Sequence, residues 1–176
     1  MARREALREL QARLAERLQA VQSSPQRTAW LAVESAGRGL LFPLATAGEI
    51  FTVPALLPVP HTLPWFVGVA NLRGGLHGVI DFAAFLGLRA PHPAGEPWRE
   101  QARVLALNPR LGSHSALLVD RLSGLRNPDQ LSPGPDAPGA RPAFAGPLWR
   151  DAAGRDWQEI DLAALAADPL FLGISQ

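Results

Sequence analysis

The stretch that decides the fold is Val67-Gly68-Val69-Ala70-Asn71-Leu72-Arg73-Gly74, with Asp81 a little further along the chain. Its apolar run ends at Gly74-Gly75, and a glycine after an arginine can adopt a positive φ and reverse the chain sharply. Residues 76–82 then have the apolar character of a buried strand. We therefore expect a tight turn here, anchored by the apolar residues that precede it.

This turn is expected to present the side chain of Arg73. A guanidinium group is a planar fork of donors, which suits the carboxylates and backbone carbonyls of a partner. Asn71 is expected to cap the turn through local hydrogen bonds. The residue types alone do not separate a binding role for Arg73 from that of an ordinary solvated turn residue, and both interpretations stay open.

Short strand-like runs lie on both sides of the turn. We expect strands over residues 30–34, 40–44, 103–108, 115–120, 148–150 and 156–160. The segments between them are rich in Pro and Gly: residues 52–64 are expected to be extended or looped, residues 90–98 to be a loop, and residues 127–147 to be irregular. Regularly spaced short strands with such punctuation are typical of small β-barrels.

Helical segments are expected to be few and short within this region. Residues 45–51 are interpreted as a helical turn, and residues 82–88 as a short helix or turn. Asp161 is a suitable N-cap for a short C-terminal helix over residues 162–167, which Pro169 would end.

The N-terminus is predicted to be an amphipathic helix. Its apolar stripe recurs at helical spacing within residues 3–22 and consists of Leu7, Leu10, Leu14, Leu18 and Val21. We therefore divide the chain into an N-terminal helix, residues 1–25, and a domain over residues 26–176. The helix either packs on that domain or binds a partner, and about three heptads are too few to decide.

The composition narrows the class of protein. The 176 residues include 16 Gly and 17 Pro and no Cys, which excludes disulfides and thiol chemistry. We recognise no signal peptide and no run of about 18 apolar residues that could span a membrane. The expected location is therefore the cytoplasm.

The charge does not indicate a nucleic-acid partner. The sequence pI is about 9.0, but the formal net charge is only +1, and the sequence contains neither Lys nor Tyr. Almost nothing except the terminal amine titrates between about pH 8 and 12, so the pI reflects an end group. A small barrel that binds nucleic acid remains the alternative, and it requires aromatic and basic side chains interleaved on an exposed strand face.

A catalytic or metal centre is not expected. The four histidines, His61, His77, His92 and His114, are scattered along the chain. Ser113-His114-Ser115 with Asp120 is the nearest approach to a hydrolase, but no Gly-x-Ser-x-Gly motif accompanies it. Without Lys, a Gly-x-x-x-x-Gly-Lys phosphate loop is excluded. We expect neither enzymatic activity nor a cofactor.

The central stretch resembles the signature of the CheW family of chemosensory adaptors. In that family a Gly-Val-x-Asn-Leu-Arg-Gly element precedes a Pro-Val-x-Asp-Leu strand, and the spacing from Asn71 to Asp81 is the family's. The similarity extends over about residues 30–165, and Gly78 stands where the family usually has Pro. Residues 65–71 and 81–87 resemble the PilI-type subgroup, which serves chemosensory systems that control type IV pilus twitching motility.

The resemblance implies a mainly β fold of two SH3-like five-stranded β-barrels around a shared apolar core, with an added N-terminal helix and a short C-terminal helix. It also implies a non-enzymatic adaptor that couples the cytoplasmic tips of chemoreceptors to a CheA-type histidine kinase. Such a protein joins membrane receptor arrays through its partners, without inserting into the membrane. The family's signature arginine lies by the receptor groove, and Arg73 matches it.

The candidate site residues follow from the motif and this match. The partner-binding set is Val69, Asn71, Leu72, Arg73 and Gly74. The structural set is Gly68, Asp81 and Asp120. Asp81 is expected either to cap a turn or to pair electrostatically with Arg73, and a structural role is favoured.

Overall fold

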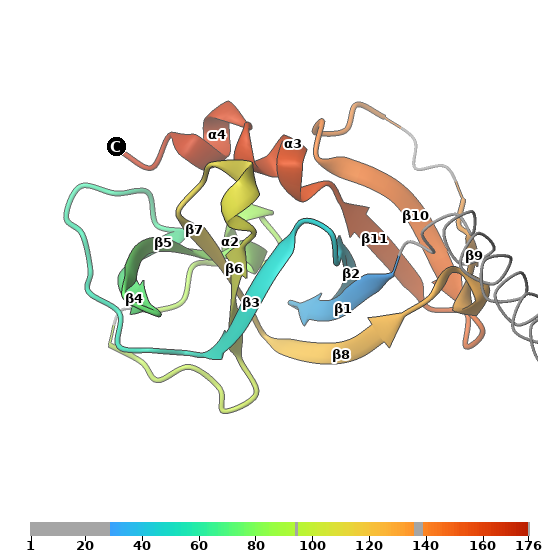
Figure 1. Cartoon of the computed structure of the whole chain (residues 1–176), viewed down its shortest axis with the longest axis horizontal. Coiled ribbons are helices and arrows are strands. Elements are labelled where there is room, and N and C mark those ends of the chain that lie inside the picture. Colours follow the sequence, from blue (N-terminus) through green and yellow to red (C-terminus); the bar gives the residue numbers. More distant parts are fainter. Residues whose placement is uncertain (1–28, 94, 136–138, 176) are drawn as a thin grey trace, which may run out of the picture.

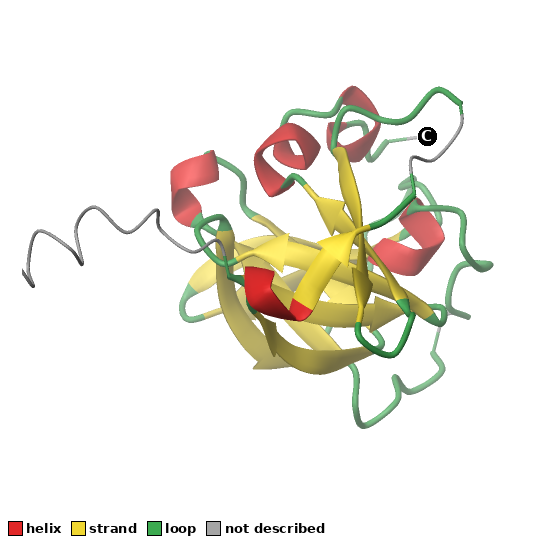
Figure 2. Cartoon of the chain, turned by 90° about the vertical axis from the view of Figure 1, so that its right-hand side faces the viewer, coloured by secondary structure: helices red, strands yellow, loops and turns green. Residues whose placement is uncertain are grey.

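The computed structural model describes residues 29–93, 95–135 and 139–175 (Figure 1). The predicted N-terminal helix over residues 1–25 lies outside the described residues. Within them, strands dominate and form two curled sheets, with short helices around the outside (Figure 2). The prediction of a mainly β fold is confirmed.

The first sheet, sheet A, combines both ends of the described chain. Its order is β8-β1-β2-β11-β10-β9. The strands are β1 (Trp30–Ser35), β2 (Arg38–Pro43), β8 (Arg121–Arg126), β9 (Leu131–Pro133), β10 (Ala145–Asp151) and β11 (Asp156–Ile160). Strand β11 runs parallel to β2, whereas the other neighbours are antiparallel.

The second sheet, sheet B, is formed by the middle of the chain. Its order is β3-β6-β7-β5-β4, so β3 and β4 are its edge strands. The strands are β3 (Ala47–Thr52), β4 (Phe66–Leu72), β5 (Gly75–Asp81), β6 (Arg103–Leu107) and β7 (Ser115–Val119). Strands β4 and β5 form the hairpin whose turn the sequence predicted, and β5 runs parallel to β7.

The helices are short and begin at acidic caps. They are α2 (Phe82–Phe85), α3 (Leu162–Ala166) and α4 (Pro169–Leu172), with 3₁₀ turns η1 (Pro109–Leu111) and η2 (Pro128–Gln130). Asp161 accepts hydrogen bonds from the first turn of α3, as predicted. Pro169 does more than end that helix: it is the first residue of α4, where its missing N–H costs nothing.

The apolar side chains form three clusters, of which one lies between the two sheets. A shared core between the sheets draws on alternate residues of β1 and β2, including Leu31, Val33 and Phe42, and on Ile80 and Leu117 from sheet B. The opposite face of each sheet has its own cluster. We call these the sheet-A cluster, with Trp30, Ala32, Leu41 and Trp157, and the sheet-B cluster, with Ala70, Leu72, Val79, Val104, Ala116 and Leu118. The predicted two-barrel fold around a shared apolar core is confirmed.

Two local expectations were wrong. Residues 45–51 do not form a helical turn, because β3 pairs with β6 over most of this segment, where Ile50, Phe51 and Thr52 all favour strands. Gly48 lies so close to β6 that an added Cβ would be 2.4 Å from the Ala106 carbonyl oxygen. Residues 127–147 are not wholly irregular either, since β9 and the start of β10 fall within them.

Candidate interaction site

The turn between β4 and β5 consists of Arg73 and Gly74, both with positive φ, at 49° and 82°. This is the arrangement of a two-residue hairpin turn that matches strand twist. The Asn71 side-chain oxygen accepts a hydrogen bond from the Gly74 N–H at 2.7 Å, which confirms the predicted local cap. A non-glycine residue with positive φ costs about 1–2 kcal/mol, so Arg73 is held in its position against a local preference.

Arg73 projects into solvent and makes one ion pair. Its side chain is 76% exposed, and its Nη2 lies 2.5 Å from Oε1 of Glu49, whose side chain is 42% exposed. Glu49 belongs to β3, so this pair joins the tip of the β4–β5 hairpin to the other edge of sheet B. Exposed pairs contribute about 0–1 kcal/mol, so Arg73 can exchange Glu49 for a partner's acceptor at little cost.

Of the other members of the predicted partner-binding set, two are exposed and two are buried or partly buried. Asn71 and Gly74 are exposed, as a contact residue must be. Leu72 is buried in the sheet-B cluster, and Val69 packs partly buried against the shared core. Leu72 therefore helps to hold the hairpin in place, whereas Val69 is still partly accessible and its role in binding stays a prediction.

Gly68 allows a second segment to pair with β4. Its φ is 133°, and an added Cβ would lie 2.4 Å from the Leu57 carbonyl oxygen. Leu57 and Val69 exchange two backbone hydrogen bonds of 2.9 Å across this approach. The glycine thus lets residues around Leu57 cover the free edge of the hairpin.

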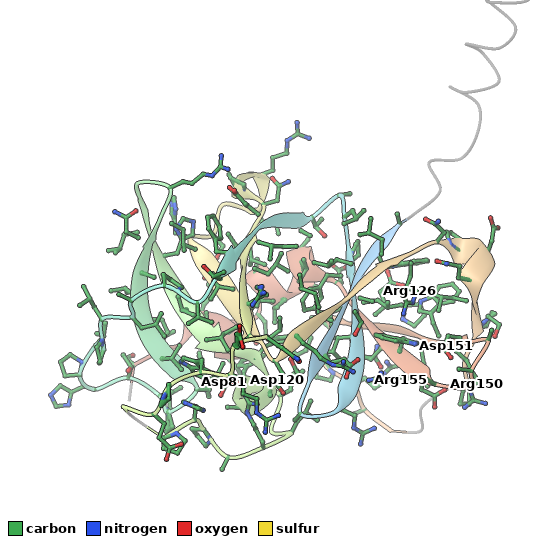
Figure 3. The ribbon with its side chains drawn as sticks, turned by 90° about the horizontal axis from the view of Figure 1, so that it is seen from below. Asp81, Asp120, Arg126, Arg150, Asp151 and Arg155 are labelled. Atoms are coloured by element: carbon green, nitrogen blue, oxygen red, sulfur yellow. The ribbon has the colours of Figure 1, made fainter. Side chains whose placement is uncertain are left out.

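Asp81 and Asp120 share one cation, Arg89. Asp81 is fully buried, and its Oδ1 accepts a hydrogen bond from Arg89 Nη2 at 2.8 Å. Asp120 Oδ1 accepts from Arg89 Nη1 at 2.6 Å, and Asp120 Oδ2 accepts from the Ala36 N–H at 2.7 Å. Figure 3 shows the two aspartates side by side. We call Asp81, Arg89 and Asp120 the junction cluster, because Ala36 connects it to the β1–β2 turn of sheet A.

The junction cluster corrects one expectation. Asp81 does cap a local element, since its Oδ1 also accepts from the Ala84 N–H at 3.3 Å in α2. It does not pair with Arg73, however, because Arg89 takes that place and Arg73 pairs with Glu49. Although burial of Arg89 acts against its charge, hydrogen bonds to Asp120 and Asp81 raise the pKa of Arg89 above its ordinary value.

A second polar cluster surrounds Glu34 in β1. Its Oε1 accepts hydrogen bonds from Arg121 at 2.7 Å, Ser123 at 2.7 Å and Arg155 at 2.9 Å. The bond from Arg155 is the main reason that the pKa of Glu34 falls from 4.5 to about 2, although burial acts in the opposite direction. Figure 3 shows Arg155 near Asp151 at this end of sheet A. The sequence analysis did not find this cluster, because Arg121 and Ser123 in β8 and Arg155 all lie far from Glu34 along the chain.

An apolar cavity of about 280 Å³ lies between parts of the two barrels. Its lining includes Trp65 and Phe85 from the sheet-B half and Phe144 and Leu170 from the C-terminal half. Leu170 in α4 is 75% exposed. Arg73 does not line this cavity, so its expected position beside a groove between the barrels stays a prediction.

The hydrolase candidates do not form a catalytic arrangement. The hydrogen bonds of Asp120 go to Arg89 and Ala36 instead of His114, and Ser113 Oγ bonds to Ser115 Oγ at 2.9 Å. Within the described residues, no group of three or more His, Asp or Glu side chains could hold a metal ion. The helices in that part of the chain are also too short or too polar to cross a membrane.

Two of the tryptophans on sheet A offer no stacking surface of the kind that the nucleic-acid alternative requires. Trp30 and Trp157 are both buried in the sheet-A cluster. Arg126 and Arg155 stack over the Trp157 ring, at 5.2 and 4.7 Å from its centroid. These arginines therefore pack against an indole that is hidden from solvent, and no base could stack on it.

Comparisons with known proteins agree with this architecture. The family model described as CheW-like domain matches residues 29–169. The chain is 32% identical to protein PilI of Pseudomonas aeruginosa over 115 residues, which is 65% of the chain and 61% of that protein. It is 44% identical to the chemotaxis protein CheW of Rhizobium meliloti over 36 residues, which is 20% of the chain and 23% of that protein. The chain thus spans less than two thirds of either relative.

A solved structure has the same fold. The crystal structure of the scaffolding protein TtCheW from Thermoanaerobacter tengcongensis superposes with a TM-score of 0.61 at 17% sequence identity. The match covers 77% of the chain and 89% of that structure. At this identity the match supports the architecture alone.

Proposed function

Because the chain belongs to the CheW-like domain family, we propose that it is a non-enzymatic adaptor that couples chemoreceptors to a CheA-type histidine kinase. The kinship with PilI supports a pathway that controls type IV pilus twitching motility. In this proposal the protein works in the cytoplasm and reaches membrane receptor arrays only through its partners. It needs no cofactor and no nucleic acid.

The observation that carries the proposal is the presentation of Arg73. The side chain stands at a rigid two-residue turn, is mostly exposed, and has only a weak partner in Glu49. Its guanidinium therefore offers spare donors in a fixed direction. The tip of a chemoreceptor is a helical hairpin, whose carboxylates and terminal carbonyls are suitable acceptors.

Coupling of this kind requires no chemistry on the adaptor. It requires that the receptor and the kinase bind surfaces of one rigid body. The adaptor's contacts with the kinase must also differ between the two states of the kinase. The shared core and the junction cluster join the two barrels over many contacts. A force or contact change on the sheet-B hairpin therefore reaches sheet A without a flexible link.

The direct test compares Arg73→Ala with Arg150→Ala in binding to a purified receptor cytoplasmic fragment. Arg150 is a matched control, because it also makes an exposed ion pair, with Asp156, but on sheet A. Loss of a central arginine anchor costs about 2 kcal/mol or more, roughly a 30-fold rise in Kd. We expect this rise for Arg73→Ala and an unchanged Kd for Arg150→Ala, with both variants folded by circular dichroism.

A third variant, Leu170→Ser, separates the hairpin from the cavity between the barrels. If the receptor Kd rises for Leu170→Ser and stays unchanged for Arg73→Ala, the receptor occupies the cavity and Arg73 is removed from its site. If neither variant changes receptor or kinase binding, the adaptor assignment of this surface is wrong. Loss of twitching in a strain that lacks the gene, restored by the wild-type chain, tests the pathway.

A further inference from the structure

Two histidines that the adaptor function does not use lie together at one end of sheet B. The parallel register pairs Gly78 of β5 with Ser115 of β7, so the residues immediately before them, His77 and His114, are also neighbours. The Gly78 N–H donates to the His114 carbonyl oxygen at 2.9 Å. The two imidazole rings are T-shaped, with centroids 5.7 Å apart and an angle of 69° between their planes.

The pair sits at the end of the row that lines the sheet-B cluster. Side chains on a strand alternate between faces, so His77 in β5 shares a face with Val79. His114 lies immediately before β7, two residues from Ala116. Both of those apolar residues belong to the sheet-B cluster. The histidines stand where this apolar row reaches solvent: His77 is half-buried and His114 is exposed.

One of the two rings has a fixed tautomer. Nδ1 of His77 lies 3.0 Å from the Gly75 carbonyl oxygen. A carbonyl oxygen only accepts, so Nδ1 is the donor here, and in the neutral ring the lone pair is then on Nε2. Metal-binding histidines characteristically donate their other N–H to a backbone carbonyl or carboxylate, which fixes the ring and raises its basicity. His77 already has this arrangement.

We propose that His77 and His114 form a two-histidine site for a divalent transition-metal ion such as Zn²⁺. A Zn–N distance of about 2.0–2.1 Å puts two imidazole centres on one tetrahedral ion roughly 5–6 Å apart. The observed 5.7 Å separation of the ring centroids falls within this range. Imidazole nitrogen suits zinc, copper and nickel better than calcium or magnesium.

The site is open and exchangeable. No third His, Asp or Glu in the described residues completes it, so water would fill the remaining positions on the ion. Coordination would tie β5 to β7 four residues from Arg73, at the base of the hairpin turn. This role is separate from the adaptor function, because it depends on neither receptor nor kinase.

The test is a titration of the full chain, free of any histidine tag, with ZnCl₂ by calorimetry and by thermal unfolding. The variants are His114→Asn and His77→Phe, of which the second keeps an aromatic ring at the packing position but has no nitrogen to bind a metal ion. His61→Asn is the control, because it removes another exposed imidazole at a positive φ of 59° that Asn tolerates.

Wild type and His61→Asn are expected to bind zinc with the same Kd and to gain thermal stability from it. Each site variant is expected to bind zinc at least about tenfold more weakly, because loss of even an outer-shell partner typically costs 10–100-fold in metal affinity. Zinc binding that is unchanged in His77→Phe or His114→Asn would overturn the proposal. So would the absence of zinc binding by the wild-type chain, and the rings would then serve packing alone.

Discussion

Replacing Arg89 by Met removes the cation of the junction cluster while keeping most of its aliphatic stem. The change strands the carboxylate of Asp81, which is fully buried and would retain only its long hydrogen bond from Ala84. It also takes one partner from Asp120, which is partly exposed and keeps its bond from the Ala36 N–H. The main cost therefore arises at Asp81.

The magnitude follows from the burial of that carboxylate. Removal of one partner of a buried ion pair costs about 3–5 kcal/mol, because the other charge is left without compensation. A domain of this size has a total stability of about 5–15 kcal/mol, so the loss is a large fraction of it. At about 2–4 °C per kcal/mol, the melting temperature should fall by roughly 10 °C.

The assay is urea unfolding followed by circular dichroism, with Arg150→Met as the matched control. Arg150 makes an exposed ion pair with Asp156, and water and salt screen such pairs so that they contribute little to stability. If Arg89→Met costs no more free energy of unfolding than Arg150→Met, the reasoning about the junction cluster is refuted. The double variant Asp81→Asn/Arg89→Met should recover part of the loss, since it removes the stranded charge itself.

Three further predictions concern single positions. In the folded protein the pKa of Glu34 is about 2, below its ordinary 4.5. Its contribution to stability, up to about 3 kcal/mol, is therefore present above pH 4.5 and lost as the pH falls toward 2. Glu34→Gln should reduce this loss of stability at low pH in unfolding experiments. Gly68→Ala should cost about 1–3 kcal/mol, more than Gly87→Ala, because both have positive φ but only the Gly68 Cβ would meet the backbone of another segment. Asp81→Asn should lower the melting temperature and leave receptor affinity unchanged; the opposite result would place Asp81 in the partner surface.

The features that the sequence predicted well are those set by neighbours in the chain. The glycine-marked turn, the Asn71 cap and the Asp161 cap each depend on hydrogen bonds over two or three residues. The short apolar runs of β1 and β2 likewise indicated strands without reference to distant residues. Such local signals need no knowledge of the fold.

The features that the sequence did not predict depend on partners far along the chain. Glu49 was missed because residues 45–51 were interpreted as a helical turn, and only pairing with β6 makes them extended. Arg89 carries no signal of its own until the ends of β5 and β7 bring Asp81 and Asp120 together. Arg155 lies 121 residues from Glu34. For pairs at such separations, one sequence offers nothing to link them.

The split origin of sheet A has a consequence for how the protein forms during synthesis. Sheet B is complete once residue 119 has left the ribosome, because all its strands lie between Ala47 and Val119. Strand β2 must wait for β11, with which it pairs across residues 39–41 and 157–159. Long-range pairings of this kind close slowly.

Until then β1, buried at every position in the finished fold, has apolar residues without their final cover. Exposed strands of this sort are prone to aggregate, and chaperones bind them. A chain that terminates before Asp156 would therefore keep a complete set of sheet-B strands but would lack β11, the strand that pairs with β2. Strand β1 therefore stays at risk of aggregation until β11 has been made and has paired with β2.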